Sequence, residues 1–178
     1  MTTLIRPSQA GDVPRLTDIY AHHVVHGSGS FELSAPDEPE MARRRTAVLE
    51  NGLPYLVAEV DGAVMGYAYA NLFRPRPAYR FLVENSVYID HQAQRLSLGR
   101  ALMAELIQRC EAQGARQMIA VIGDSANLGS IRLHQGLGFE HVGLIRSSGW
   151  KHQRWLDTVM MQRALGLGDL TPPHTGTP

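Results

Sequence analysis

The residues best suited to chemistry lie where a predicted strand passes into a predicted helix. Residues 87–89 are strand formers, and an apolar stripe from Leu98 onward predicts an amphipathic helix that stops at Gly114. The first N–H groups of a helix lack partners inside it, and the helix dipole places partial positive charge there. Because Ser97 and Gly99 are small, a phosphate could approach this backbone closely. The residues alone leave open an ordinary connection without a ligand.

Three arginines in a proline-containing loop form a second candidate site. Arg74, Arg76 and Arg80 closely precede Glu84, and two prolines among them forbid a regular strand. A guanidinium group makes paired hydrogen bonds to a carboxylate or phosphinate, which suits an amino-acid-like ligand. The alternative is that all three are solvated surface arginines.

Asn127 and His134 form a third candidate, in a helix predicted to open at a turn over residues 123–127. They are seven positions apart, and about 100° per residue returns both side chains to one stripe of the helix. The pair can therefore face one site together. A core or surface histidine bonded to the backbone would show the same spacing.

The elements that position these residues alternate in a way that predicts one mixed α/β domain. Asp61-Gly62 separates two strand-like runs and is the strongest hairpin signal in the chain. A turn is predicted at 147–152, and a Gly/Pro/Thr-rich tail from Leu165 is expected to be disordered, which leaves residues 1–164 as the domain. The predicted strands are 4–6, 55–60, 64–70, 87–89, 117–122, 139–145 and 155–162, and the predicted helices are 13–26, 37–51, 98–114 and 127–137.

Composition excludes several classes of function. The 178 residues carry 17 basic and 17 acidic side chains, so no general affinity for nucleic acid or anionic membranes is indicated. The single cysteine, Cys110, lies on an apolar helix stripe and is expected in the core. His22 and His26 share a helix face, which more often is solvated than metal-binding, so no metal site is expected. Without a long apolar run or signal-peptide pattern, a cytoplasmic enzyme is the simplest expectation.

The loop over residues 94–99 resembles the acetyl-CoA pyrophosphate loop of the GNAT superfamily of N-acetyltransferases. The family pattern has glycine where this chain has Ser97, and Arg95 and Leu96 also differ from glycines common in this branch. The resemblance covers nearly the whole chain and is closest to the phosphinothricin acetyltransferase and L-amino acid N-acyltransferase branch. The segments that carry it are 76–80, 84–88, 119–127, 130–134, 137–139 and 149–157.

This resemblance implies the acyl-CoA N-acyltransferase fold, a mixed and mostly antiparallel central sheet flanked by helices. It also implies acetyl-CoA as the co-substrate, with no further cofactor and no metal, and a homodimeric assembly. The residues that would bind acetyl-CoA are Val87, Tyr88, Ile89, Arg95, Leu96, Ser97, Leu98, Gly99, Arg100 and Asn127.

Acetyl transfer from a thioester to an amine needs a base for the amine proton and donors for the oxyanion. The resemblance places the general base at Glu84, acting directly or through a water, against the alternative of a surface glutamate. It gives His134 a role in proton transfer. The residues expected to bind the acceptor are Phe31, Arg74, Arg76, Tyr79, Arg80 and Ser86.

The expected reaction is acetylation of a small amino-acid-like acceptor of the phosphinothricin or methionine sulfone type. The arginine-rich loop favours a free amino acid, because a peptide N-terminus lacks a carboxylate beside its amine. Two alternatives remain: acetylation of a peptide or protein N-terminus, and a non-catalytic module that binds acyl-CoA.

Overall fold

The protein is built on one seven-stranded sheet in the order β1-β2-β3-β4-β5-β7-β6. The computed structural model describes residues 2–93 and 96–173. All neighbouring strands are antiparallel except β4 and β5, which confirms the predicted mixed, mostly antiparallel sheet. The strands are β1 Thr3–Pro7, β2 Tyr55–Val60, β3 Ala63–Leu72, β4 Leu82–Ile89, β5 Gln117–Gly123, β6 Glu140–Lys151 and β7 Arg154–Ala164.

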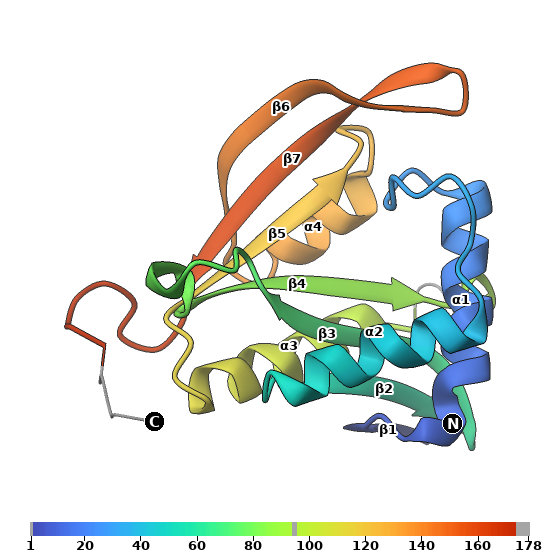
Figure 1. Cartoon of the computed structure of the whole chain (residues 1–178), viewed down its shortest axis with the longest axis horizontal. Coiled ribbons are helices and arrows are strands. Elements are labelled where there is room, and N and C mark those ends of the chain that lie inside the picture. The colour runs from blue at the N-terminus through green and yellow to red at the C-terminus, as the bar shows by residue number, and fades with distance from the viewer. Residues whose placement is uncertain (1, 94–95, 174–178) are drawn as a thin grey trace.

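Helices cover both faces of the sheet, so that two apolar cores form (Figure 1). The larger core lies beneath α3 and includes the apolar stripe predicted for that helix, with Cys110 fully buried as expected. Burial raises the pKa of the Cys110 thiol to about 12. The smaller core lies beneath α1 and α2 on the opposite face. The helices are α1 Val13–His26, α2 Glu38–Glu50, α3 Leu98–Ala112 and α4 Leu128–Gln135, with short 3-10 turns η1 Ala10–Asp12, η2 Pro77–Tyr79 and η3 His91–Ala93.

Two hairpins test the turn predictions. At Asp61-Gly62 both residues have positive φ, as a two-residue hairpin turn requires, so this prediction is confirmed. The predicted turn at 147–152 is wrong, because β6 continues to Lys151 and the chain reverses at His152-Gln153. The glycine and serines that suggested a turn instead form an irregularity in β6, where the pairing with β7 shifts register.

The tail begins later than predicted. Leu165 is 1% exposed in the larger core, and its N–H donates to the Arg116 carbonyl. Arg116 also donates to the carbonyl and hydroxyl oxygens of Thr171. The apolar Leu165 therefore anchors the chain past the predicted boundary, while residues 174–178 lie outside the described part. No helix among the described residues has the length and apolar character needed to cross a membrane.

The parallel pair β4 and β5 is the feature of the fold that creates a site. Their pairing begins at Leu82 with Gln117 and ends at Asn85 with Ala120. Beyond this point β4 remains paired with β3 to Ile89, and β5 remains paired with β7 to Gly123. The two strands therefore diverge, as Figure 1 shows, and their facing backbone groups become available to a ligand.

Candidate active site

A cavity of about 680 Å³ occupies the space where β4 and β5 diverge. Its walls come from both strands, from α4, and from the segment after α1, including Gly27 and Gly29. Unpaired strand edges offer amide N–H and carbonyl groups on both sides, which suits an extended ligand with amide groups of its own. The sequence-predicted residues that line this cavity are Ser86, Val87, Tyr88, Ile89, Asn127 and His134.

The start of α3 lies beside this cavity. A Cβ placed on Gly99 would contact Leu133 at 3.3 Å and Ile89 at 3.7 Å, and both of these residues line the cavity. The Leu98 side chain is buried in the core, so only its backbone is available to a ligand. Leu96, Ser97 and Arg100 belong to the same turn, whereas Arg95 lies outside the described residues. The predicted anion site at a helix N-terminus is therefore adjacent to the cavity.

Ser97, which stands where the pattern described above has glycine, adopts the left-handed conformation with φ of 58°. A non-glycine residue in this region carries a cost of roughly 1–2 kcal/mol. The Ser97 side chain makes no capping hydrogen bond to α3, so its removal loses no contact of that kind. We expect Ser97→Gly to raise the free energy of unfolding by about 0.5–1 kcal/mol in urea titrations, since part of the gain is offset by backbone entropy. A lower stability would contradict this account.

Glu84 lies on β4 opposite Asn71 of β3 and Ile119 of β5. Because side chains alternate along a strand, Glu84 shares a sheet face with Ser86 and Tyr88. Burial raises the pKa of the Glu84 carboxyl above its ordinary value, while the charge of Arg74 lowers it to a smaller extent. A carboxyl with a raised pKa is suited to accept a proton near neutral pH.

His134 is 2% exposed, and both of its ring nitrogens are engaged inside the protein. Nδ1 lies 2.8 Å from the Ser130 carbonyl oxygen, and Nε2 lies 2.9 Å from Oδ1 of Asn85. Asn85 in turn donates through Nδ2 to the Ile119 carbonyl at 3.1 Å. Burial lowers the pKa of His134, although its contact with Ser130 raises it. This chain of contacts links α4 to both strands at the point where they separate.

Asn127 is the N-cap of α4, as the predicted turn over residues 123–127 requires. Its side-chain oxygen accepts from the Ser130 N–H at 3.3 Å, and its amide donates to the Gly123 carbonyl at 3.5 Å. The capping contact fixes the start of the helix. Asn127 lies just outside the helix, and it and His134 both line the cavity.

The segment between α1 and α2 is held against the cavity by contacts to three elements. The Phe31 ring packs on Gly149 of β6, where an added Cβ would lie 2.5 Å from it. Lys151 donates from Nζ to the Ser30 carbonyl at 2.6 Å. The Ser30 hydroxyl lies 2.9 Å from the Tyr20 hydroxyl. Phe31 is thereby fixed next to Gly123, at the end of β5.

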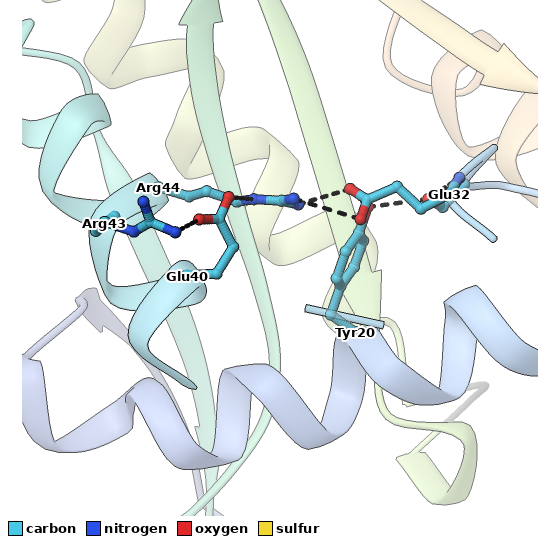
Figure 2. A network of polar contacts seen from close by, with 6 residues as sticks. Tyr20, Glu32, Glu40, Arg43 and Arg44 are labelled. Carbon is cyan, nitrogen blue, oxygen red and sulfur yellow. Dashed lines mark hydrogen bonds and ion pairs between the residues drawn. The ribbon is translucent and has the colours of Figure 1, made fainter. Parts of the chain in front are cut away.

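A polar network ties the same segment to both helices (Figure 2). Arg44 of α2 donates to Glu32 at 2.6 Å and to Glu40 at 2.7 Å, and the Tyr20 hydroxyl donates to Glu32 at 2.8 Å. Arg43 forms a further ion pair with Glu40. Hydrogen bonds from Arg44 and Tyr20 oppose the effect of burial and leave the pKa of Glu32 below its ordinary value. The network thus carries fixed charges of both signs.

The predicted acceptor-binding arginines do not gather in one place. Arg74 lies over the Phe73 ring and near enough to lower the pKa of Glu84. Arg76 precedes η2, and the exposed Tyr79 at the end of η2 contacts Phe73 edge to face. Arg80 lies over the Phe81 ring and lines a different cavity, at the end of β4 where the pairing with β5 begins. The charge of Arg74 therefore acts on Glu84, whereas Arg80 lines a different cavity.

Comparisons with known proteins agree with this geometry. The model of the Acetyltransferase (GNAT) family matches residues 18–139. A phosphinothricin N-acetyltransferase of Alcaligenes faecalis is 52% identical over 170 residues, covering 96% of this chain and 86% of that protein. An L-methionine sulfoximine/L-methionine sulfone acetyltransferase of Salmonella typhimurium is 36% identical over 161 residues, covering 90% and 94% respectively.

A solved structure shows that the similarity extends to the three-dimensional fold. A GNAT superfamily phosphinothricin acetyltransferase from Sinorhizobium meliloti, crystallised with AcCoA, superposes with a TM-score of 0.96 at 50% identity. The match covers 99% of this chain and 95% of that one.

A mixed sheet whose parallel pair opens around a cavity, with a helix start beside it, defines an acyl-CoA N-acyltransferase fold. The chain belongs to the GNAT acetyltransferase family. It is therefore an acetyltransferase, and enzymes of this family use acetyl-CoA as co-substrate.

Proposed function

We propose that this protein transfers the acetyl group of acetyl-CoA to the amine of a small amino-acid-like acceptor of the phosphinothricin or methionine sulfone and sulfoximine type. The observation that carries the proposal is the cavity between β4 and β5, which lies next to a carboxylate of raised pKa. The names of relatives that cover nearly the whole chain supply the acceptor class.

Acetyl-CoA is proposed to lie along the diverging strands. Its diphosphate would accept hydrogen bonds from backbone N–H groups in the turn that begins α3, over residues 96–100; Arg95, also expected to take part, lies outside the described residues. Its pantetheine arm would follow the free edge of β4 at residues 87–89 and pass Asn127. Because a free strand edge offers N–H and carbonyl groups, the strand would bind this arm mainly through its backbone. The thioester would then reach the closed end of the cavity near Ser86.

Glu84 is proposed to act as the general base, directly or through a water. An amine is largely protonated at neutral pH, and a carboxylate of raised pKa can take that proton. The free amine then attacks the thioester carbonyl, and an N–H at the free edge of β4 stabilises the oxyanion. Collapse of this intermediate forms the amide and releases the CoA thiolate, which takes up the proton that the attacking nitrogen loses.

His134 is proposed to serve the proton transfers of this site. Such a role requires its Nε2 to part from Asn85, since both ring nitrogens are engaged within the protein. In the arrangement observed, His134 contacts Asn85 where β4 and β5 separate, and burial lowers the pKa of its ring.

Arg74 and Arg76 are proposed to bind the anionic group of the acceptor, because the charge of Arg74 acts on Glu84 and guanidinium groups bind carboxylates and phosphinates in pairs of hydrogen bonds. Ser86 would contact the acceptor near the thioester, and Phe31 would form one wall of its site. Tyr79, which is exposed, would line the outer part of the acceptor site. Arg80, whose side chain lines a different cavity, would take part only if its loop moved.

The test is release of CoA from acetyl-CoA by the purified protein with a panel of amino acids, their sulfones and short peptides. We expect turnover with phosphinothricin and methionine sulfone and little with peptides. Preferred turnover of peptides would indicate an N-terminal acetyltransferase. Binding of acetyl-CoA without release of CoA for any acceptor would indicate a non-catalytic module.

We further propose that the protein is a homodimer in the cytoplasm. The edge strand β6 exposes several large apolar side chains, and such a patch commonly marks an interface. A reducing compartment suits a chain with one buried cysteine. The exposed apolar side chains on β6 and β7 are Val142, Leu144, Ile145, Trp150 and Trp155.

A further inference from the structure

The central strand β5 carries an apolar side chain that is open to solvent. Val121 is 39% exposed, whereas its neighbours Ala120 and Ile122 are buried. Because β5 lies between β4 and β7, this exposure is not that of a sheet edge. The exposed side chain instead marks an opening in the cover of the sheet, and Val121 lines the cavity between β4 and β5.

Strand register places Val121 beside the proposed base. Glu84 of β4 pairs with Ile119 of β5, and the pairing of the two strands ends one residue later. Val121 follows Ile119 by two positions, so its side chain lies on the sheet face that carries Glu84. Ser86 shares this face and lines the same cavity. Val121 and Ser86 therefore lie on opposite sides of the opening, on the face from which an amine at Glu84 would attack the thioester.

The Phe31 ring bounds this open surface on the side away from the base. Two glycines leave room for the ring: an added Cβ would lie 2.9 Å from it at Gly123 of β5 and 2.5 Å from it at Gly149 of β6. Gly123 follows Val121 by two positions and shares its face. Met160 of β7, which is paired with Val121, is half-buried and extends the apolar surface. Val121 and Met160 thus form an apolar floor between the proposed base and the Phe31 ring.

The three groups of an α-amino acid can each reach a partner around this floor. The amine is proposed to lie at Glu84, on which the charge of Arg74 acts. Arg74 follows β3, on one side of β4, whereas Val121 belongs to β5, on the other side. A carboxylate directed toward Arg74 therefore leaves the side chain directed toward Val121. An apolar floor favours methylene groups there, because contact removes apolar surface from water.

We propose that Val121 is a specificity residue for the acceptor, and that the methylene stem of the acceptor side chain lies on its exposed surface. The inference rests on the proposed function, and it names the part of the site that selects the side chain. An acceptor with a stem of several carbons gains apolar contact with the floor that a one-carbon side chain, such as that of alanine, lacks.

The first test is Val121→Phe, measured as kcat/KM for methionine sulfone and for alanine with acetyl-CoA as the donor. A phenyl ring at this position fills the space of the stem, so we expect the ratio of the two values to fall about 10-fold. The value for alanine should stay within about threefold of wild type, because its methyl group does not extend over the floor. Since Val121 is exposed, the melting temperature should remain close to that of wild type.

Val25→Phe provides the matched control, because Val25 is an exposed valine on α1 that does not line the cavity. We expect this variant to keep the wild-type ratio. An unchanged ratio in a folded Val121→Phe variant overturns the proposal, as does an equal loss for both acceptors. A changed preference between acetyl-CoA and propionyl-CoA with an unchanged acceptor ratio also overturns it, because Val121 would then contact the acyl group.

A second variant, Val121→Thr, tests the apolar character of the floor separately from its size. Threonine keeps the branched shape of valine but replaces one methyl group with a hydroxyl. We expect KM for methionine sulfone to rise about threefold with kcat retained, and both constants for alanine to stay unchanged. An equal KM in variant and wild type overturns the proposal. A wild-type protein without turnover for any acceptor would instead overturn the proposed function itself.

Discussion

Replacing Glu84 with glutamine is expected to lower kcat by about 10²–10⁴-fold while acetyl-CoA binding is retained. Glutamine keeps the shape of the side chain but cannot accept the amine proton, and general bases contribute a factor of this size. Steady-state release of CoA gives kcat, and calorimetric titration with acetyl-CoA gives the binding constant. Unchanged turnover across the pH range would remove Glu84 from the mechanism.

Glu84→Gln is also expected to change how the free energy of unfolding depends on pH. Burial raises the pKa of Glu84 in the folded state above its value in the unfolded chain. The folded state therefore binds more protons between these two pKa values, and wild-type stability falls as pH rises through that interval. Glutamine does not ionise, so the variant does not lose stability over this interval. Glu84→Gln should therefore be as stable as wild type at acidic pH and more stable at neutral pH. Urea unfolding at both pH values measures the difference.

Replacing Leu102 with alanine is expected to lower the free energy of unfolding by about 2–5 kcal/mol. Leu102 is fully buried in the larger core, where α3 packs on the sheet, and its loss leaves a cavity that the surrounding side chains fill only in part. The helix whose first turn is proposed to hold the diphosphate depends on this packing. Chemical denaturation of the two proteins gives the difference.

Leu49→Ala provides the matched control, because Leu49 is an exposed leucine on α2. Its substitution should change stability by no more than about 0.5 kcal/mol. Equal costs at the two positions would show that burial beneath α3 does not dominate the stability of the fold.

Local signals in the sequence predict most of the fold. The stripe from Leu98 to Cys110 and the Asp61-Gly62 turn depend on spacing within one element, and the structure confirms both. The error at 147–152 has a clear cause: glycine and serine mark a turn and a strand irregularity equally well, and only pairing with β7 distinguishes them. The sequence places Leu165 in the tail, because its burial depends on core residues distant in sequence.

The site is predicted less completely than the fold, because its shape depends on pairing across strands. The resemblance supplied the lining residues of β4 and α4, and the cavity contains them. Asn85 was missed, although a polar residue within a buried strand is a signal that could have singled it out.

A crystal structure of this protein with acetyl-CoA tests the central claim most directly. The account predicts that the diphosphate accepts hydrogen bonds from the backbone at the start of α3, and that the thioester ends between β4 and β5 near Ser86, within reach of an amine at Glu84. Density for the co-substrate outside the diverging strands, or a thioester directed away from the Glu84 face of the sheet, would contradict it.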